Sequence, residues 1–367
     1  MPCILVEEDP ILRVVPAILD PNTPTEHQRA IAQFYDFDEP DFIGWRDRLR
    51  ARLPGLYPST VIFAADQDDL RKKIAEADGV IVESLKIGRE EIAAARKIAI
   101  VQKWGGLVAN IDLLECAQHC VAVRTQRRRV NIAVAEQAFA FMMTLAKRIC
   151  ELNGLVEDDR LRLAGFDTTP FDRRYTGNSN FARVTGLRTL NGAVLGAIGL
   201  GEIGREVATR AHVFGMKVLY HQRHRLAPID EWTLGASYCP LNELLETSDF
   251  ISIHVPLNPS TRGFLNREAL RRIKQGAILV NVARAEVIER EALLETLEAG
   301  RLGGFALDVG YDEPAKKGEP LLKYKNVILV PHTAPAHRRN GLNDWEEMFL
   351  NMSSVLTAAR NALPVPP

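Results

Sequence analysis

The segment Gly196-Ala-Ile-Gly-Leu-Gly-Glu-Ile-Gly204 decides the fold that we expect for the second half of the chain. An apolar run, Val194–Ile198, precedes it and a helical pattern follows it, so its glycines lie where a strand turns into a helix. In such a turn Gly199 permits a tight bend, Gly201 lets the backbone approach a ligand, and Gly204 lets the helix pack closely on the strand. The segment therefore predicts the first strand and helix of a parallel α/β domain.

Short apolar strands alternate with helices over most of the chain, which is typical of a parallel sheet covered on both faces. In the second half we expect six strands, at Val194–Ile198, Lys217–Tyr220, Phe250–His254, Ala277–Asn281, Gly304–Asp308 and Val327–Val330. In the first half we expect four, at Val61–Ala64, Gly79–Val82, Ile98–Val101 and Val121–Val123. The first sixty residues predict two helices, near 25–35 and 41–53, and we assign no strand there.

The length of 367 residues exceeds the limit of about 250–300 residues for one hydrophobic core, so we expect two domains. The longest helical pattern covers 131–152, with Asn131 as its expected cap. It is apolar on most sides, which indicates burial between domains or subunits. A last helix over 344–359 is expected to pack on the first domain. The stretch 154–192 has no periodicity and is long for a connection, so it predicts a functional loop or an arm that reaches a partner.

Composition and charge exclude several classes of protein. The 46 basic and 47 acidic residues give a formal charge of −1, so neither nucleic acid nor a membrane surface is an expected partner. No apolar run is long enough to span a bilayer, and the first residues lack the basic region of a signal peptide. Five cysteines without framework spacing indicate reduced thiols in a cytoplasmic protein. We expect no metal site, because Cys116 and Cys120 have no second ligand pair at zinc spacing.

The glycine turn has the sequence context of a dinucleotide-binding motif. Backbone amides at the start of the following helix, around Glu202 and Ile203, would face the phosphates. Where an NAD-binding chain normally places an acidic residue on the ribose, this chain has Gln222-Arg-His-Arg225. Because arginine binds phosphate bidentately, Gln222 and Arg223 favour NADP(H). A solvated basic loop that leaves NAD(H) preferred is the alternative.

Three side chains after expected strands suit hydride and proton chemistry. Arg284 follows a strand end, where a guanidinium can grip a carboxylate and polarise a neighbouring carbonyl. His332 also follows a strand, and histidine is the side chain best suited to proton transfer near neutrality. Glu313 can orient the imidazole and favour its protonated form. We therefore expect Arg284, Glu313 and His332 to be catalytic.

Together with further motifs, these residues resemble the D-isomer-specific 2-hydroxyacid dehydrogenase family, which includes the glyoxylate, hydroxypyruvate and phosphoglycerate enzymes. The resemblance runs from about Asp78 to about Pro335. Its other marks are Gly106-Leu-Val-Ala-Asn-Ile-Asp112, Val134-Ala-Glu-Gln137, His254-Val-Pro-Leu-Asn-Pro-Ser-Thr-Arg-Gly263, Asn281-Val-Ala-Arg284 and Pro331-His-Thr-Ala334.

The resemblance implies two doubly wound, Rossmann-like α/β domains with the active site in the cleft between them. Residues 1–125 and 331–367 would form the discontinuous substrate-binding (catalytic) domain, and residues 126–330 the dinucleotide-binding domain. The implied activity is hydride transfer between NAD(P)H and a 2-oxo acid or D-2-hydroxy acid, with His332 as general acid and base, in a homodimer. Implied cofactor contacts are Pro256, Thr261, Val282, Ala283 and Asp308. Implied substrate contacts are Trp104, Gly105, Gly106 and Arg284.

Some residues depart from the family pattern and leave alternatives open. Ala285 follows the expected catalytic arginine, and Pro335 follows the Pro-His-Thr-Ala motif, where the family usually has glycine. Lys103 or Trp104 would add selectivity for substrate, or would be a surface lysine and a packed indole. The basic cluster Arg124–Arg129 is either a solvated hinge face or an anchor for an acidic group. The alternatives for function are a dinucleotide-sensing corepressor-like protein and a dehydrogenase of formate or phosphite.

Overall fold

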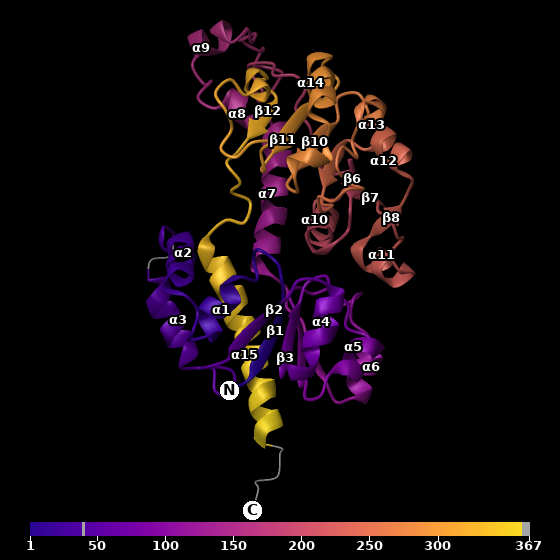
Figure 1. The fold of residues 1–367 in the computed structure, drawn as a ribbon. Coiled ribbons are helices and arrows are strands. Elements are labelled where there is room, and N and C mark those ends of the chain that lie inside the picture. Colours follow the sequence, from indigo (N-terminus) through magenta and orange to yellow (C-terminus); the bar gives the residue numbers. More distant parts are fainter. Residues whose placement is uncertain (39–40, 362–367) are drawn as a thin grey trace, which may run out of the picture. The chain divides into compact units, whose positions relative to one another are not determined.

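The computed structural model describes residues 1–38 and 41–361. The chain folds into two compact units. One unit contains Met1–Asn131 and the chain from Pro335 onward, and the other contains Ile132–Ala334. The boundaries that we expected lie at 125/126 and 330/331, a few residues earlier in both places. Figure 1 labels many of the helices and strands of both units.

The first unit is built on a parallel sheet of five strands in the order β2-β1-β3-β4-β5. The strands are β1 (Cys3–Glu7), β2 (Thr60–Ala64), β3 (Gly79–Val82), β4 (Ile100–Lys103) and β5 (Ala122–Arg124). Our prediction missed β1, which lies between β2 and β3. Its apolar run, Ile4–Val6, lies in the first sixty residues, where we expected no strand.

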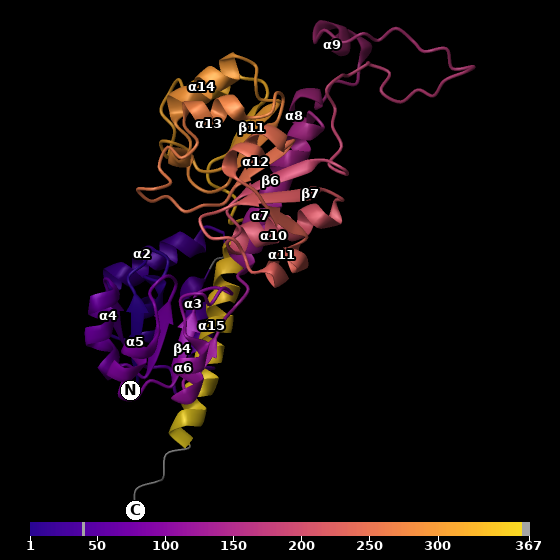
Figure 2. The ribbon, with the colours of Figure 1, turned by 90° about the vertical axis from the view of Figure 1, so that its right-hand side faces the viewer.

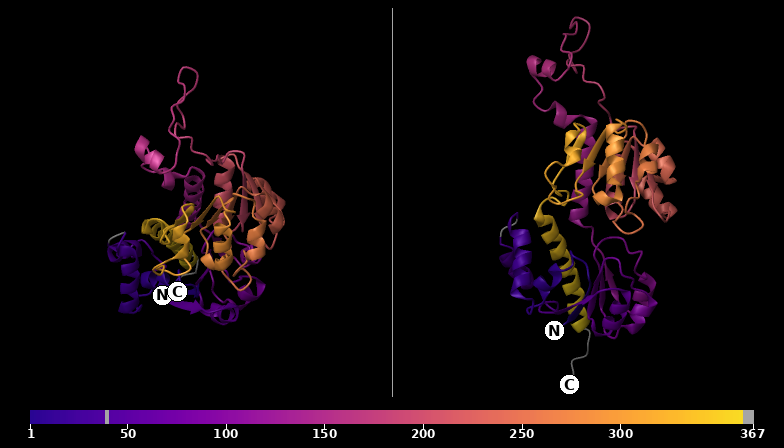
Figure 3. Two further views of the ribbon diagram at one scale, coloured as in Figure 1. Left: turned by 90° about the horizontal axis from the view of Figure 1, so that it is seen from above. Right: turned by 45° about the horizontal axis from the view of Figure 1, so that its top comes forward.

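Helices cover both faces of this sheet because alternate strand residues point to opposite sides. Ile4 and Val6 pack in the cluster that contains α15 (Arg338–Asn361), whereas Leu5 packs in the cluster on the other face. Figures 1 and 3 show α15, in yellow, lying along the sheet of this unit, as we expected of the last helix. The other helical segments are α1 (Val14–Leu19), α2 (Thr25–Asp36), α3 (Phe42–Arg50), α4 (Gln67–Lys73), η1 (Ile74–Glu76), α5 (Arg89–Ala94) and α6 (Leu113–Gln118).

The second unit is built on a parallel sheet of seven strands in the order β12-β11-β10-β9-β6-β7-β8. The strands are β6 (Val194–Ile198), β7 (Lys217–His221), β8 (Ala236–Tyr238), β9 (Phe250–Ile253), β10 (Ile278–Asn281), β11 (Gly304–Leu307) and β12 (Val327–Leu329). The six expected strands are present, and β8 corrects the prediction as a seventh, short edge strand. The strand order reverses between β6 and β9, and ligands of such sheets bind at this point, beyond the carboxyl ends of the strands.

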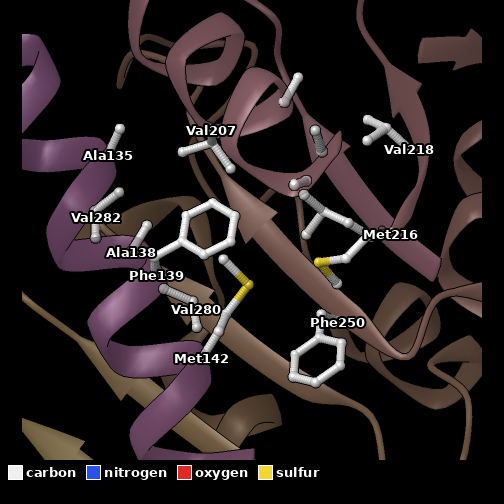
Figure 4. Packing of buried hydrophobic residues seen from close by; sticks show 14 of the residues in the cluster. Ala135, Ala138, Phe139, Met142, Val207, Met216, Val218, Phe250, Val280 and Val282 are labelled. Atoms are coloured by element: carbon white, nitrogen blue, oxygen red, sulfur yellow. The ribbon is translucent and has the colours of Figure 1, made fainter. Parts of the chain in front are cut away.

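The helices of this unit cover both faces of its sheet. They are α10 (Glu202–Val213), α11 (Pro228–Leu234), α12 (Leu241–Thr247), α13 (Arg267–Arg272), α14 (Arg290–Glu298) and the short η2 (Ala285–Val287) and η3 (Pro320–Lys323). One face is also covered by α7 (Arg129–Ala146), whose Phe139 and Met142 pack with Val207, Val280 and Phe250 (Figure 4). The apolar character of α7 thus serves packing on the sheet of its own unit.

The single helix that we expected over 131–152 is two helices with a different cap. Arg148 has φ +53, and a second helix, α8 (Ile149–Leu152), begins after it. The N-terminus of α7 is capped by Asp344 of α15, not by Asn131. The Asp344 carboxylate accepts the backbone N–H groups of Arg129 at 3.0 Å and Val130 at 3.3 Å. Burial raises the pKa of Asp344.

The stretch 154–192 contains one short helix, α9 (Asp158–Leu163), and residues 164–193 form no helix or strand. Figure 2 shows this segment extending away from the rest of its unit. Large apolar side chains are exposed along it, including Leu163 and Tyr175, which are 91% and 83% exposed.

Candidate active site

The glycine turn links β6 to α10, and each glycine has a different reason to lack a side chain. Gly199 has φ +93, and an added Cβ would lie 3.0 Å from Val255 and 3.2 Å from the His254 carbonyl. A Cβ on Gly204 would lie 2.2 Å from the carbonyl oxygen of Gly199, so helix and strand touch there. Apart from its two chain neighbours, no described residue would have an atom within 4 Å of a Cβ on Gly201. Gly201 therefore presents open backbone immediately before α10, which begins at Glu202 and Ile203.

The residues after β7 are only partly available for a ribose phosphate. Gln222 is tied to the glycine turn, since its Oε1 accepts the N–H of Leu200 at 3.0 Å. Arg225 donates twice to the Glu231 carboxylate, at 2.9 Å each, so this arginine already has an anionic partner. Arg223 is exposed and donates to the His224 ring at 3.0 Å. The basic charge that we expected to meet a 2′-phosphate is thus reduced to Arg223 and its histidine neighbour.

A cavity of about 540 Å³ lies between this segment and the loop after β9. Pro256 and Thr261 line it together with Gln222 and Arg223, so four of the expected cofactor contacts surround one space. Thr261 donates its hydroxyl to the Pro256 carbonyl at 2.6 Å, which closes the loop on itself. The volume is within the range of about 300–1,000 Å³ that small-molecule sites have.

The turn after β10 carries Val282, Ala283 and Arg284 and is held by Asn281, a motif residue to which we assigned no role. Asn281 is fully buried, accepts the N–H of Ala283 at 2.9 Å and donates to the Arg284 carbonyl at 2.9 Å. Val282 is buried and Arg284 is exposed, with Nη1 donating to the Ala283 carbonyl at 2.8 Å. An asparagine at the end of a strand is the sequence signal for such a turn, because its side chain forms hydrogen bonds with backbone groups two or three residues further along the chain.

Asp308 follows β11 and is 1% exposed. Its Oδ1 accepts the N–H groups of Thr333 at 2.9 Å and Ala334 at 3.0 Å, whereas its buried Oδ2 has no hydrogen-bond partner among the described residues. Burial raises the pKa of this carboxyl group. An unpaired buried oxygen costs free energy unless a donor reaches it, so Oδ2 is a ready acceptor for a ligand.

Glu313 and His332 meet at the same edge of the sheet. Nδ1 of His332 lies 3.3 Å from Oε2 of Glu313, and Oε1 of Glu313 accepts the N–H of Gly310 at 3.1 Å. His332 has φ +55, and its N–H donates to the Asp308 carbonyl at 2.9 Å. Arg284 follows β10, which lies two strands from β12 in the same parallel sheet, so it shares this edge with the pair.

The expected substrate loop lies in the five-stranded unit, after β4. Trp104 is 3% exposed and stacks on Trp345 of α15 with ring centroids 4.0 Å apart. Gly105 has φ +139 and accepts the N–H of Gln126 at 2.9 Å, and Gly106 is exposed. Lys103 is buried and its Nζ donates to the Glu83 carbonyl, so the alternative of a surface lysine is wrong and that of a packed indole is right.

In the basic cluster Arg124–Arg129, one arginine binds carboxylates of α15 and another packs on an aromatic ring. Arg129 donates to Asp344 at 3.0 Å and to Glu347 at 2.8 Å. Arg128 lies over the Trp104 ring, 5.3 Å from its centroid.

Among the described residues no group of three His, Cys, Asp or Glu side chains could hold a metal ion. In the same part of the chain, no helix is both long and apolar enough to cross a bilayer.

Comparison with known proteins identifies the family of the chain. Residues 139–334 match the family model of the D-isomer specific 2-hydroxyacid dehydrogenase NAD-binding domain. The chain is 35% identical over 257 residues to a glyoxylate reductase of Korarchaeum cryptofilum, covering 68% of this chain and 70% of the relative. It is 33% identical over 302 residues to the human D-3-phosphoglycerate dehydrogenase, covering 81% of this chain and 53% of that longer protein.

Solved structures share the fold over almost the whole chain. The TT0316 protein of Thermus thermophilus is 29% identical, with a TM-score of 0.52 and 97% of each chain covered. A glyoxylate reductase of Paecilomyes thermophila is 24% identical, with a TM-score of 0.54 over 97% of this chain and 95% of that one. These likenesses confirm the two parallel-sheet α/β domains, and the sequence relatives confirm the resemblance drawn from the motifs. The chain belongs to the D-isomer specific 2-hydroxyacid dehydrogenase family.

Proposed function

We propose that the protein catalyses reversible hydride transfer between a nicotinamide dinucleotide and a 2-oxo acid, forming a D-2-hydroxy acid. The observation that carries the proposal is the Glu313–His332 pair, 3.3 Å apart at the sheet edge that also holds the glycine turn. A carboxylate-backed imidazole beside a dinucleotide site is the arrangement that carbonyl reduction needs. The proposed substrate is a small molecule, with no nucleic acid or membrane partner.

The residues of the seven-stranded unit fit the cofactor that the family model implies. Open backbone at Gly201 and the first amides of α10 suit a pyrophosphate. The unpaired Oδ2 of Asp308 suits a carboxamide N–H donor. When bound, the nicotinamide supplies the hydride. We assign cofactor binding to this unit and substrate binding to the loop of the other unit that carries Gly105 and Gly106, in which the Trp104 ring packs on Trp345.

Side chains of the protein exchange the proton and bind the substrate carboxylate. Because Glu313 holds Nδ1 of His332, the other ring nitrogen is left to exchange a proton with the substrate oxygen. Arg284, exposed at the same edge, would bind the substrate carboxylate through its guanidinium fork.

We propose a preference for NADP(H) over NAD(H). The segment after β7 has no acidic residue at the position that normally receives the ribose hydroxyls, and exposed Arg223 lines the adjoining cavity. We also propose a homodimer in which the exposed apolar side chains of the 154–192 segment meet a second copy.

The test follows the absorbance of NADPH and of NADH with a panel of 2-oxo acids. We expect turnover with at least one acid, and we expect His332→Ala to lower kcat by about 10²–10⁴-fold. His119→Ala, at an exposed histidine at the end of α6, is the matched control and should keep full activity. No turnover across the panel, with retained dinucleotide binding, would favour the corepressor-like alternative. Reduction of NADP⁺ by formate or phosphite alone would favour the second one.

A further inference from the structure

A cavity of about 500 Å³ opens beside the Glu313–His332 pair, wholly within the seven-stranded unit. Both members of the pair line it. Most of its remaining wall is apolar and comes from β11, β12 and the segment between them, including Leu307, Tyr311, Pro314, Leu321, Leu322 and Leu329. The volume lies within the range of about 300–1,000 Å³ for small-molecule sites, which are mostly apolar with a few polar groups. The cavity therefore has the size and lining of a binding site and borders the proposed general acid.

The charged groups of the wall are acidic. Asp312, Glu313 and Glu319 line the cavity, and no lysine or arginine does so among the described residues. Two cations outside the wall neutralise part of this charge. Arg290 has Nη2 2.6 Å from Glu319 and Nη1 3.9 Å from Asp312, and Lys316 Nζ lies 3.4 Å from Asp312. The carboxylates remain on the wall, so an anionic group that entered would meet like charge in a partly desolvated space. An apolar group would meet leucine and proline side chains.

Resting on the function proposed above, we propose that this cavity receives the side chain of the substrate. The substrate is then a 2-oxo acid with an uncharged, apolar side chain. Glyoxylate has no side chain to fill the space, and an acid with a second carboxylate or a phosphate would be repelled by the wall. Discrimination by an apolar pocket is about 10–200-fold for each methylene group.

The test compares kcat/KM for pyruvate, 2-oxo-4-methylpentanoate and 2-oxoglutarate, with the nicotinamide that supports turnover. The isobutyl acid should exceed both others by at least about tenfold. Leu322 lines the cavity and is 70% exposed, so an arginine there needs no burial. Leu322→Arg should shift the ratio of the isobutyl acid to 2-oxoglutarate at least about tenfold toward 2-oxoglutarate. Leu322→Met should retain the wild-type ratio.

Leu114→Arg is the matched control, because Leu114 is 69% exposed on α6 of the other unit, and it should leave the ratio unchanged. Equal or faster turnover of pyruvate or 2-oxoglutarate by the wild type would overturn the inference while the proposed function stands. An unchanged ratio in Leu322→Arg, together with an altered sedimentation coefficient, would assign the cavity to a subunit contact and overturn it too.

If no acid is turned over, the proposed function is wrong. Calorimetry then still tests whether the cavity binds an apolar side chain. Binding of 2-hydroxy-4-methylpentanoate should be detected with the wild-type protein and weakened at least about tenfold by Leu322→Arg. Absence of binding, or binding that the substitution leaves unchanged, would overturn the inference.

Discussion

Replacing Gly201 or Gly204 by alanine adds the same methyl group to the same turn, but the two variants should lose different properties. A Cβ on Gly204 would lie 2.2 Å from the carbonyl oxygen of Gly199, closer than the 3.0 Å that real Cβ atoms keep. The helix or the turn must then move, and overpacking of this kind costs about 1–3 kcal/mol. A Cβ on Gly201 meets nothing within 4 Å, and φ −69 with ψ −162 is accessible to alanine.

The magnitudes follow from the size of the unit. For a unit of about 200 residues, 1 kcal/mol shifts Tm by about 2–4 °C, so Gly204→Ala should lower Tm by about 2–12 °C. Gly201→Ala should change stability by no more than about 0.5 kcal/mol, or about 2 °C. Calorimetric scans with and without NADPH identify the relevant transition, because a ligand raises the Tm of the unit that binds it.

The affinity for the cofactor, unlike Tm, should depend on Gly201. Gly201→Ala should weaken NADPH binding at least about tenfold, or ~1.4 kcal/mol, because its methyl group stands where the backbone would approach the pyrophosphate. Fluorescence titration with NADPH measures this directly. Unchanged affinity in a stable Gly201→Ala variant would refute a pyrophosphate at this turn. An unchanged Tm in Gly204→Ala would refute the close contact of helix and strand.

Three further variants test other parts of the site. Arg223→Ser should raise the Kd for NADPH about 10–100-fold with little change for NADH, whereas Arg225→Ser, at an arginine already paired, should affect NADPH much less. In a double-mutant cycle on kcat, Glu313→Gln should cost far more in the wild type than in His332→Ala, since the carboxylate acts through the imidazole. Burial raises the pKa of Asp344. The free energy of unfolding linked to its titration is therefore largest below the ordinary aspartate pKa and is lost as pH rises through the raised value. Urea unfolding from pH 3 to 8 should show this pH dependence in the wild type and not in Asp344→Asn.

Much of the fold could be predicted because its signals are local. Short apolar runs between helical patterns mark the glycine turn and five further strands of the second unit. β8 lacks such marks, because Ala236–Tyr238 is short and contributes little apolar sequence to the sheet edge. β1 was missed although it has five residues, as β6 and β7 have, so its length does not explain the error. Pairing with neighbouring strands defines both, and the segment itself does not encode its pairing.

Contacts between distant residues limited the prediction of the site in the same way. Asn131 carries the sequence signal of a helix cap, yet the cap of α7 is Asp344, 215 residues from Arg129 in the chain. Arg225 looks like a free cation in the sequence, but α11 folds back and places Glu231 against it. In both cases residue type gave the right chemistry, and only the tertiary structure gave the partner.

Asp308 serves two parts of this site at once. His332 has φ +55, a conformation that costs about 1–3 kcal/mol for a residue other than glycine. Three hydrogen bonds to Asp308 hold it there: its carbonyl accepts the N–H of His332, and its Oδ1 accepts those of Thr333 and Ala334. The residue whose Oδ2 is proposed to meet the cofactor therefore also fixes the backbone of the proposed general acid. A loss of activity on replacing Asp308 would report both effects together, and only a separate measurement of dinucleotide affinity would separate them.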